Sequence, residues 1–147
     1  MEIQIRADCP IPGLDGQKIE VKAKRVLKDL GCHDKELSIL FTDDETIAEL
    51  NQQYRGKEGA TDVLSFSMLE EAGPTLFEPI MLGDVVISVD TALRDANELE
   101  QPFERTVDQL LIHGILHLLG FDHEKSPVDA GLMAKEEERL LAQLVKP

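Results

Sequence analysis

The most constraining feature of this 147-residue sequence is an apolar helical segment, residues 103–119, with polar side chains along one face. Leucine, isoleucine and valine occupy nearly every other direction, which is typical of a central buried helix. The polar residues recur at steps of three or four: Thr106, Gln109, His113, His117 and Gly120. This spacing puts them on a single face. The face is therefore either a site inside the core or part of a core that tolerates histidine.

The segment HGILHLLGFDH, residues 113–123, holds three of the four histidines in the chain. Two imidazoles one helical turn apart can reach a single ion, as in the HExxH helix of metalloproteases. On a continuous helix His123 would lie roughly 15 Å from His113, too far to share a metal. Gly120 is the residue at which we expect a left-handed helix end and a turn that returns His123 to the pair. The spacing predicts a three-nitrogen metal site with an open fourth position, which is the catalytic kind of zinc site.

Three neighbouring residues limit the chemistry of this predicted site. Position 114 is glycine, where a zinc peptidase carries the glutamate that acts as general base, so the spacing does not favour a peptidase. Asp122 and Glu124 flank His123 and either orient an imidazole, accept a proton or act only as solubilising groups. The remaining histidine, His33, lies in a predicted loop, where we expect it to be solvated and without a role.

Hydrophobic periodicity predicts one α+β domain spanning residues 1–147. The predicted strands are 2–6, 36–42, 63–67 and 80–88, and the predicted helices are 17–30, 43–54, 91–99, 103–119 and 128–145. Residues 68–79 contain two prolines and a glycine and are predicted to form a loop. Gly83, inside the last strand, indicates a bulge or a close backbone approach. The expected architecture is a single layer of about four strands packed with helices, in which the central buried helix carries the histidines, a zincin-like arrangement.

Charge and composition exclude several classes of protein. The formal net charge of -14 argues against non-specific DNA binding, so we expect no DNA partner. The longest apolar stretch is about twelve residues, whereas a membrane span needs about twenty, and no signal-peptide pattern is present. We therefore expect a cytoplasmic protein without a membrane partner. Lys22 and Arg25 share a basic face of the helix 17–30, which is either solvated or a surface that meets phosphates.

The histidine segment, together with NQQYRGKEGATDVLSFS at 51–67 and LGDVVIS at 82–88, resembles the YbeY family of bacterial ribosomal RNA maturation factors. The resemblance covers nearly the whole chain, with Phe121 in place of a tyrosine in the family motif HGxLHLxGYDH. It implies a metal-dependent, single-strand-specific endoribonuclease that acts in 16S ribosomal RNA 3′-end maturation and ribosome quality control. It also implies Zn²⁺, or a similar transition metal such as Ni²⁺, at His113, His117 and His123. The small ribosomal subunit and its assembly factors are the implied partners.

The resemblance also assigns a functional role to Arg55. A planar guanidinium binds phosphate in a bidentate manner and can stabilise charge that develops on phosphorus, whereas a lone arginine at a helix end is more often a surface group. We predict Arg55 and His113 as catalytic residues. The predicted RNA contacts are Arg55, Lys57, Lys22 and Arg25. Two alternatives stay open: an assembly factor with a mainly structural metal site, and a metal-dependent hydrolase of another substrate.

Overall fold

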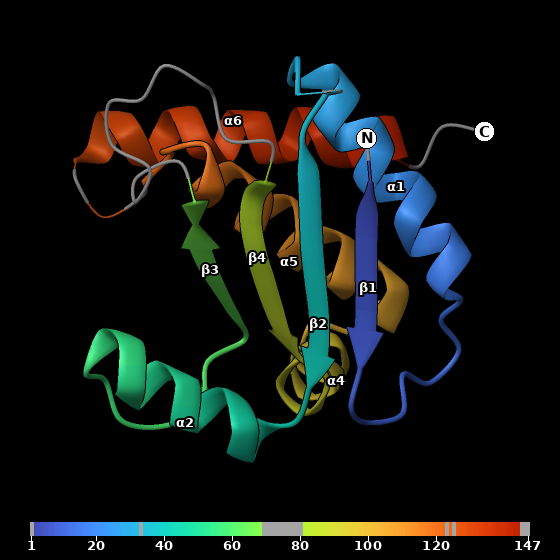
Figure 1. The fold of residues 1–147 in the computed structure, drawn as a ribbon, viewed down its shortest axis with the longest axis vertical. Coiled ribbons are helices and arrows are strands. Elements are labelled where there is room, and N and C mark those ends of the chain that lie inside the picture. Colours follow the sequence, from blue (N-terminus) through green and yellow to red (C-terminus); the bar gives the residue numbers. More distant parts are fainter. Residues whose placement is uncertain (1, 33, 69–80, 123, 125, 145–147) are drawn as a thin grey trace.

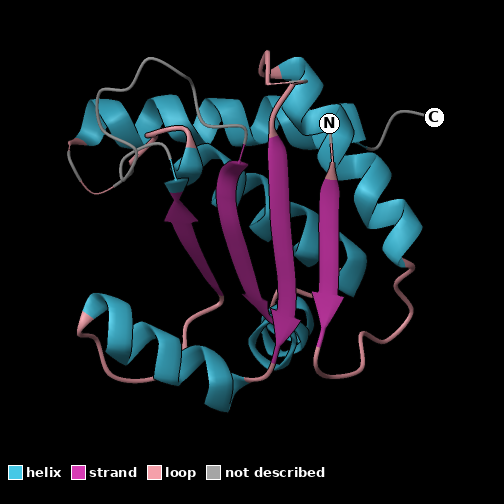
Figure 2. Cartoon of the chain, in the orientation of Figure 1, coloured by secondary structure: helices cyan, strands magenta, loops and turns pink. Residues whose placement is uncertain are grey.

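A computed structural model describes residues 2–32, 34–68, 81–122, 124 and 126–144 of the chain. Its centre is a four-stranded sheet with the strand order β1-β2-β4-β3 (Figure 2). The strands are β1 Ile3–Ala7, β2 Glu36–Thr42, β3 Val63–Ser67 and β4 Met81–Ser88. β1, β2 and β4 are parallel, whereas β3 runs antiparallel to β4 and forms one edge. The predicted α+β class and the four predicted strands are confirmed.

Five helices are described, and α5 and α6 cross behind the sheet in Figure 1 while α2 and α4 lie at its lower end. They are α1 Gly16–Asp29, α2 Asp44–Arg55, α4 Val89–Glu98, α5 Phe103–Leu118 and α6 Pro127–Leu144. The predicted loop 68–79 falls, except for Met68, outside the described residues. None of the helices in the described ranges combines the length and apolar character needed to cross a bilayer.

The helix predicted at 91–99 begins earlier, at Val89. Ser88 is the N-cap: its hydroxyl accepts a hydrogen bond from the backbone N–H of Thr91 at 3.2 Å. A serine cap satisfies one of the amide groups that the first turn leaves without a helical partner. The strand β4 therefore passes directly into α4, without the two-residue connection expected from the sequence.

The sheet separates two apolar clusters. Alternate strand residues point to opposite faces, so Val85 and Ile87 enter the large cluster while Val86 faces the other side. The large cluster includes residues of α1, α5 and α6, whereas the small one joins Ile47 of α2 to Leu64 and Val86. Ten of the 16 residues of α5 are buried, which confirms the predicted central buried helix.

Two glycines let α5 approach the sheet closely. A Cβ atom on Gly83 would meet the backbone oxygen of Phe66, and it would lie 2.8 Å from Cδ2 of Leu118. The pairing register with β2 also shifts beside Gly83, so the predicted bulge and close approach are both confirmed. On α5 itself, a Cβ atom at Gly114 would lie 2.7 Å from Cγ1 of Val85. The glycine at the position of the peptidase glutamate thus serves close packing, because a Cβ atom there would displace the side chain of Val85 on β4.

We expect Gly114→Ala to destabilise the fold by about 1–3 kcal/mol, the usual cost of overpacking a core, despite the higher helix propensity of alanine. Gly131→Ala is the matched control, because Gly131 is exposed on α6 and a Cβ atom there meets nothing within 4 Å. Urea unfolding of both variants gives the two free energies of unfolding. A Gly114→Ala protein as stable as Gly131→Ala would contradict the close packing of α5 on β4.

Candidate active site

His113 and His117 lie one turn apart on α5 and direct their rings toward the same point. Their Nε2 atoms are 3.1 Å apart, and their ring centroids are 4.6 Å apart at an interplanar angle of 73°. Both side chains are partly buried, within a helix whose other faces are apolar. The sequence therefore predicted correctly that α5 brings these two imidazoles together. The third predicted ligand, His123, lies outside the described residues.

The chain turns sharply directly after the histidine pair. Gly120 has a φ of 97°, and its backbone N–H donates to the carbonyl oxygen of His117 at 3.0 Å. The backbone N–H of Phe121 donates to the carbonyl oxygen of Leu116 at 3.1 Å. These two bonds make a Schellman motif, which ends a helix with a left-handed residue. The predicted turn at Gly120 is confirmed, and the ring of Phe121 packs against the core.

We expect Gly120→Ala to cost about 1 kcal/mol or more of folding free energy, because an L residue disfavours a positive φ. A Cβ atom at this position meets nothing within 4 Å, so the cost comes from the backbone alone. Thermal or urea unfolding beside the Gly131→Ala control measures it. Metal affinity should fall as well, since the turn leads into the predicted ligand His123. Unchanged stability together with unchanged affinity would refute this role of the turn.

Glu137 of α6 contacts the far side of the first imidazole. Its Oε1 atom lies 3.3 Å from Nδ1 of His113, and both side chains keep some exposure, 33% and 25%. A carboxylate at this distance favours the tautomer in which Nδ1–H donates to Glu137 and Nε2 keeps its lone pair. Nε2 is the atom that faces His117. The arrangement thus prepares His113 to coordinate a cation through Nε2.

The paired nitrogens match the size of a transition metal. Two ligands of a tetrahedral ion with bonds of about 2.0–2.1 Å lie about 3.3 Å apart, close to the observed 3.1 Å between the two Nε2 atoms. Among the described residues, no three histidine, cysteine, aspartate or glutamate side chains are arranged to hold a metal ion. The described part of the chain thus supplies two nitrogens that fit such an ion, and further ligands would have to come from elsewhere.

A pocket of about 520 Å³ opens over the histidine pair and brings it together with the predicted arginine and lysine. Arg55, the last residue of α2, and Lys57 line this pocket with His113 and His117. The sequence could not show this proximity, because the histidines and these cations are separated by more than fifty residues. Four predicted site residues therefore share one cavity.

A buried asparagine holds the loop that follows Arg55 and carries Lys57. The side chain of Asn51 is 6% exposed, and its Nδ2 atom donates to the carbonyl oxygen of Gly59 at 3.0 Å. Gly56, the C-cap of α2, has a φ of 65°, and the backbone N–H of Lys57 donates to the carbonyl oxygen of Asn51 at 3.4 Å. Sequence analysis missed Asn51. Its position four residues before Arg55, on the same helical face, was the available signal.

Two serines fasten the histidine helix to the edge strand. The Oγ atom of Ser65 donates to the carbonyl oxygen of Gly114 at 2.9 Å, and that of Ser67 donates to the carbonyl oxygen of Leu118 at 3.2 Å. Both serines also line the pocket. These bonds fix α5 against β3, so the imidazoles keep a defined position relative to the mouth of the pocket. Neither these serines nor Glu137 carried a sequence signal, because their partners lie far away in the chain.

The charges around the pocket favour an added cation. Its described lining contains two cations, Arg55 and Lys57, and three carboxylates, Asp62, Asp122 and Glu124. A phosphodiester would thus enter a region with a slight excess of negative charge unless a positive ion compensates for it. The Oδ1 atom of Asp122 accepts a hydrogen bond from the backbone N–H of Glu124 at 2.8 Å, so this carboxylate oxygen already has a backbone partner. Its role as proton acceptor stays a prediction.

The basic residues of α1 lie away from this pocket. α1 packs along β1, whereas the pocket lies at β3, the opposite edge of the sheet (Figure 1). Lys22, expected on a phosphate-facing surface, donates instead from Nζ to Glu104 at 2.7 Å and to Asp108 at 3.0 Å. Burial opposes its charge, yet these hydrogen bonds outweigh burial and raise the pKa of Lys22. The structure does not bring Lys22 or Arg25 together with the histidines, and RNA contact by either stays a prediction.

The family model and the curated relatives that match this chain carry the same name. The family model described as Endoribonuclease YbeY matches residues 13–145. The endoribonuclease YbeY of Syntrophus aciditrophicus is 43% identical over 141 residues, which cover 95% of this chain and 88% of the relative. That of Aquifex aeolicus is 48% identical over 129 residues, covering 88% and 83%. The solution structure of TM1509 from Thermotoga maritima has a TM-score of 0.65 at 25% identity, covering 97% of this chain and 88% of that one.

Proposed function

The chain belongs to the YbeY family of endoribonucleases, hydrolases that act on RNA, and we propose from this premise that it cleaves single-stranded ribosomal RNA in the pocket over His113 and His117. The observation that carries the proposal is the shared cavity, in which this imidazole pair meets Arg55 and Lys57. Paired nitrogen ligands and phosphate-binding cations together suit phosphodiester hydrolysis better than either group alone.

Within this proposal, His113, His117 and His123 hold one transition metal, with Zn²⁺ as the expected ion. When bound, the ion supplies Lewis acidity toward a phosphoryl oxygen. Glu137 orients His113 through the Nδ1 contact. Arg55 binds the non-bridging oxygens of the phosphate in a bidentate manner and stabilises the negative charge that builds up there during cleavage. Lys57 adds a second positive charge for the entering strand.

The cellular role that we propose is maturation of the 3′ end of 16S ribosomal RNA and quality control of ribosomes. The small ribosomal subunit and its assembly factors would then be the partners, and the cytoplasm the place of action. The support is the membership in a family of endoribonucleases and the cations at the pocket.

Cleavage of a defined single-stranded RNA by Zn²⁺-loaded protein tests the proposed activity. We expect cleavage that a chelator abolishes and that His113→Ala lacks. The same protein should leave a duplex of the same sequence intact, and simple esters and peptides serve as further control substrates. Hydrolysis of those substrates without RNA cleavage would favour a hydrolase of another class.

A second candidate is an assembly factor whose metal is mainly structural. The net charge of -14 favours it, because an RNA enzyme that works alone usually attracts phosphates with a positive surface. In that case His113→Ala would lower stability, and the wild-type protein would bind the small subunit without cutting single-stranded RNA.

A further inference from the structure

We infer that Tyr54 is a stacking platform for one unpaired base of the bound strand and that it contributes to selection of single strands over duplexes. The inference rests on the proposed function, since it adds a base contact to the proposed phosphate contact of Arg55. Tyr54 is 62% exposed, and it is the only aromatic residue among the large, strongly exposed apolar side chains in the described part of the chain. An exposed tyrosine ring offers a flat apolar face with a polar tip, which is suited to stacking against a base.

The ring of Tyr54 is held in place by a second aromatic ring. Its centroid lies 5.3 Å from that of Phe66, at an interplanar angle of 69°, which is an edge-to-face contact. Phe66 in turn packs against the small apolar cluster formed by Ile47, Leu64 and Val86. The edge-to-face geometry uses only one part of the tyrosine ring, and the high exposure leaves room for a base to stack. Because the ring is already oriented, stacking would cost little conformational entropy.

Tyr54 does not line the pocket itself but is the chain neighbour of Arg55, which does. It precedes Arg55 in the last turn of α2, so their Cα atoms are about 3.8 Å apart. Along β3, Ser65 and Ser67 line the pocket while Phe66 faces the opposite side of the strand. β3 is the edge strand of the described sheet. In the inferred arrangement the nucleic acid passes around this edge, with a phosphate at Arg55 and the adjacent base on Tyr54.

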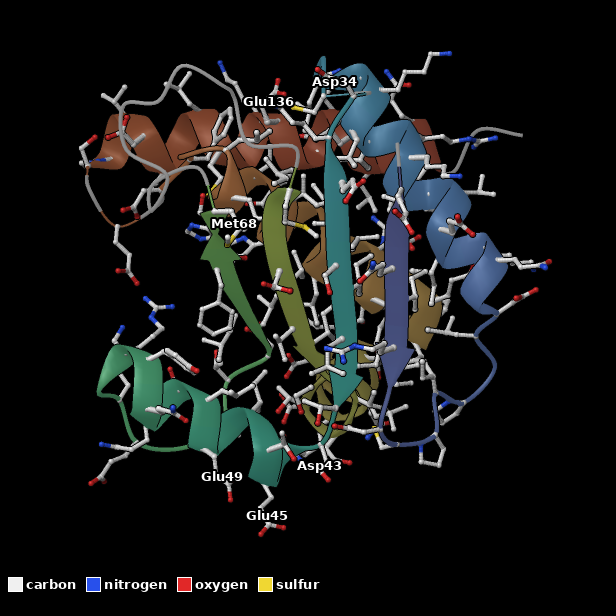
Figure 3. All side chains as sticks on the ribbon, viewed as in Figure 1. Asp34, Asp43, Glu45, Glu49, Met68 and Glu136 are labelled. Carbon is white, nitrogen blue, oxygen red and sulfur yellow. The ribbon has the colours of Figure 1, made fainter. Side chains whose placement is uncertain are left out.

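The charge distribution along α2 agrees with this direction of approach. In Figure 3, the side chains of Glu45, in the first turn of α2, and Glu49, at its middle, point away from the sheet. The positive residue of α2 is at its other end, next to Tyr54. A phosphate backbone would thus be attracted to the C-terminal end of α2 and repelled from its start. Only an unpaired base could reach the tyrosine, since both faces of a base inside a duplex are covered by its neighbours.

The test measures binding of a 2′-O-methyl oligoadenylate of roughly eight nucleotides, within the length range of single-strand sites, to Zn²⁺-loaded protein at low salt. Strand integrity is checked on a gel. Tyr54→Leu should weaken binding about tenfold, the scale of one lost base–aromatic stack, while Tyr54→Phe should stay within about twofold of wild type because it keeps the ring. Val128→Ala, which alters an exposed apolar residue on α6, is the control and should leave binding unchanged.

Two further readouts distinguish stacking from a general loss of affinity. Affinity for a duplex of the same length should be nearly equal in wild type and Tyr54→Leu, so the preference for single strands should shrink about tenfold in the variant. The chain has one tyrosine and no tryptophan, so intrinsic emission reports on Tyr54 directly and should be quenched when the strand binds. Circular dichroism confirms that each variant is folded.

The outcomes separate this inference from the proposed function. If wild type binds the single strand and Tyr54→Leu binds it equally well, or if the tyrosine emission does not change at saturation, the stacking role is wrong and the proposed function stands. If wild type binds no single-stranded RNA, the proposed function is contradicted, and this inference falls with it.

Discussion

Replacement of His113, His117 and His123 by alanine together should reduce bound transition metal from about one ion per chain to nearly none. The reason is that the imidazoles are the proposed ligands, and the two described ones already present their Nε2 atoms 3.1 Å apart. Each single variant should weaken Zn²⁺ binding sharply, because a site with three protein ligands loses a full coordination bond. Elemental analysis of purified protein and competition with a chromophoric chelator measure stoichiometry and affinity.

Glu137→Gln should weaken Zn²⁺ binding less than the histidine variants do. It keeps the size of the side chain but weakens the acceptor for Nδ1–H of His113, so Zn²⁺ affinity should fall about 10–100-fold without loss of stoichiometry. His33→Ala is the matched control, since no metal role is predicted for that histidine. A triple variant that retains one Zn²⁺ per chain would refute the site, whereas full affinity in Glu137→Gln would refute only the supporting role of the carboxylate.

Arg55→Ala should leave the fold and the metal content intact yet lower RNA cleavage about a hundredfold or more. This is the scale on which removal of one charge-stabilising donor slows a reaction. Arg55 is exposed at the end of α2 and lines the pocket with both described histidines, so its loss removes a phosphate contact without opening the core. Single-turnover cleavage of a single-stranded RNA, at matched metal loading and low salt, measures the effect.

Arg55→Lys tests whether geometry or charge alone matters at this position. Lysine keeps the charge but cannot form a bidentate contact, so this variant should stay clearly impaired if the planar guanidinium clamps the phosphate. Arg6→Ala is the control, because Arg6 is an exposed arginine on β1, the opposite edge of the sheet. Wild-type rates in Arg55→Ala would remove the arginine from the proposed mechanism and leave Lys57 as the proposed phosphate contact in the pocket.

The sequence by itself determined where the helices and strands lie approximately and that His113 and His117 share one face of a helix. Helical periodicity located α5 to within one residue of its observed end, and the spacing of four residues alone puts His113 and His117 on one face. The glycine after the helix predicted the left-handed turn, which the φ of 97° at Gly120 confirms. Such features are readable from a sequence because they depend on residues within about one or two helical turns of each other.

Only the tertiary structure decided which distant groups meet. In the fold, Arg55 lines one pocket with the two described histidines. Lys22 forms ion pairs with Glu104 and Asp108 away from that pocket, and Glu137 contacts His113. These contacts depend on strand order and on how closely α5 packs against β4, which no local periodicity encodes. A surface charge such as Lys22 has the same sequence signature whether it faces solvent, a phosphate or a carboxylate. The packed fold decides between these partners, because burial makes an unpaired charge costly.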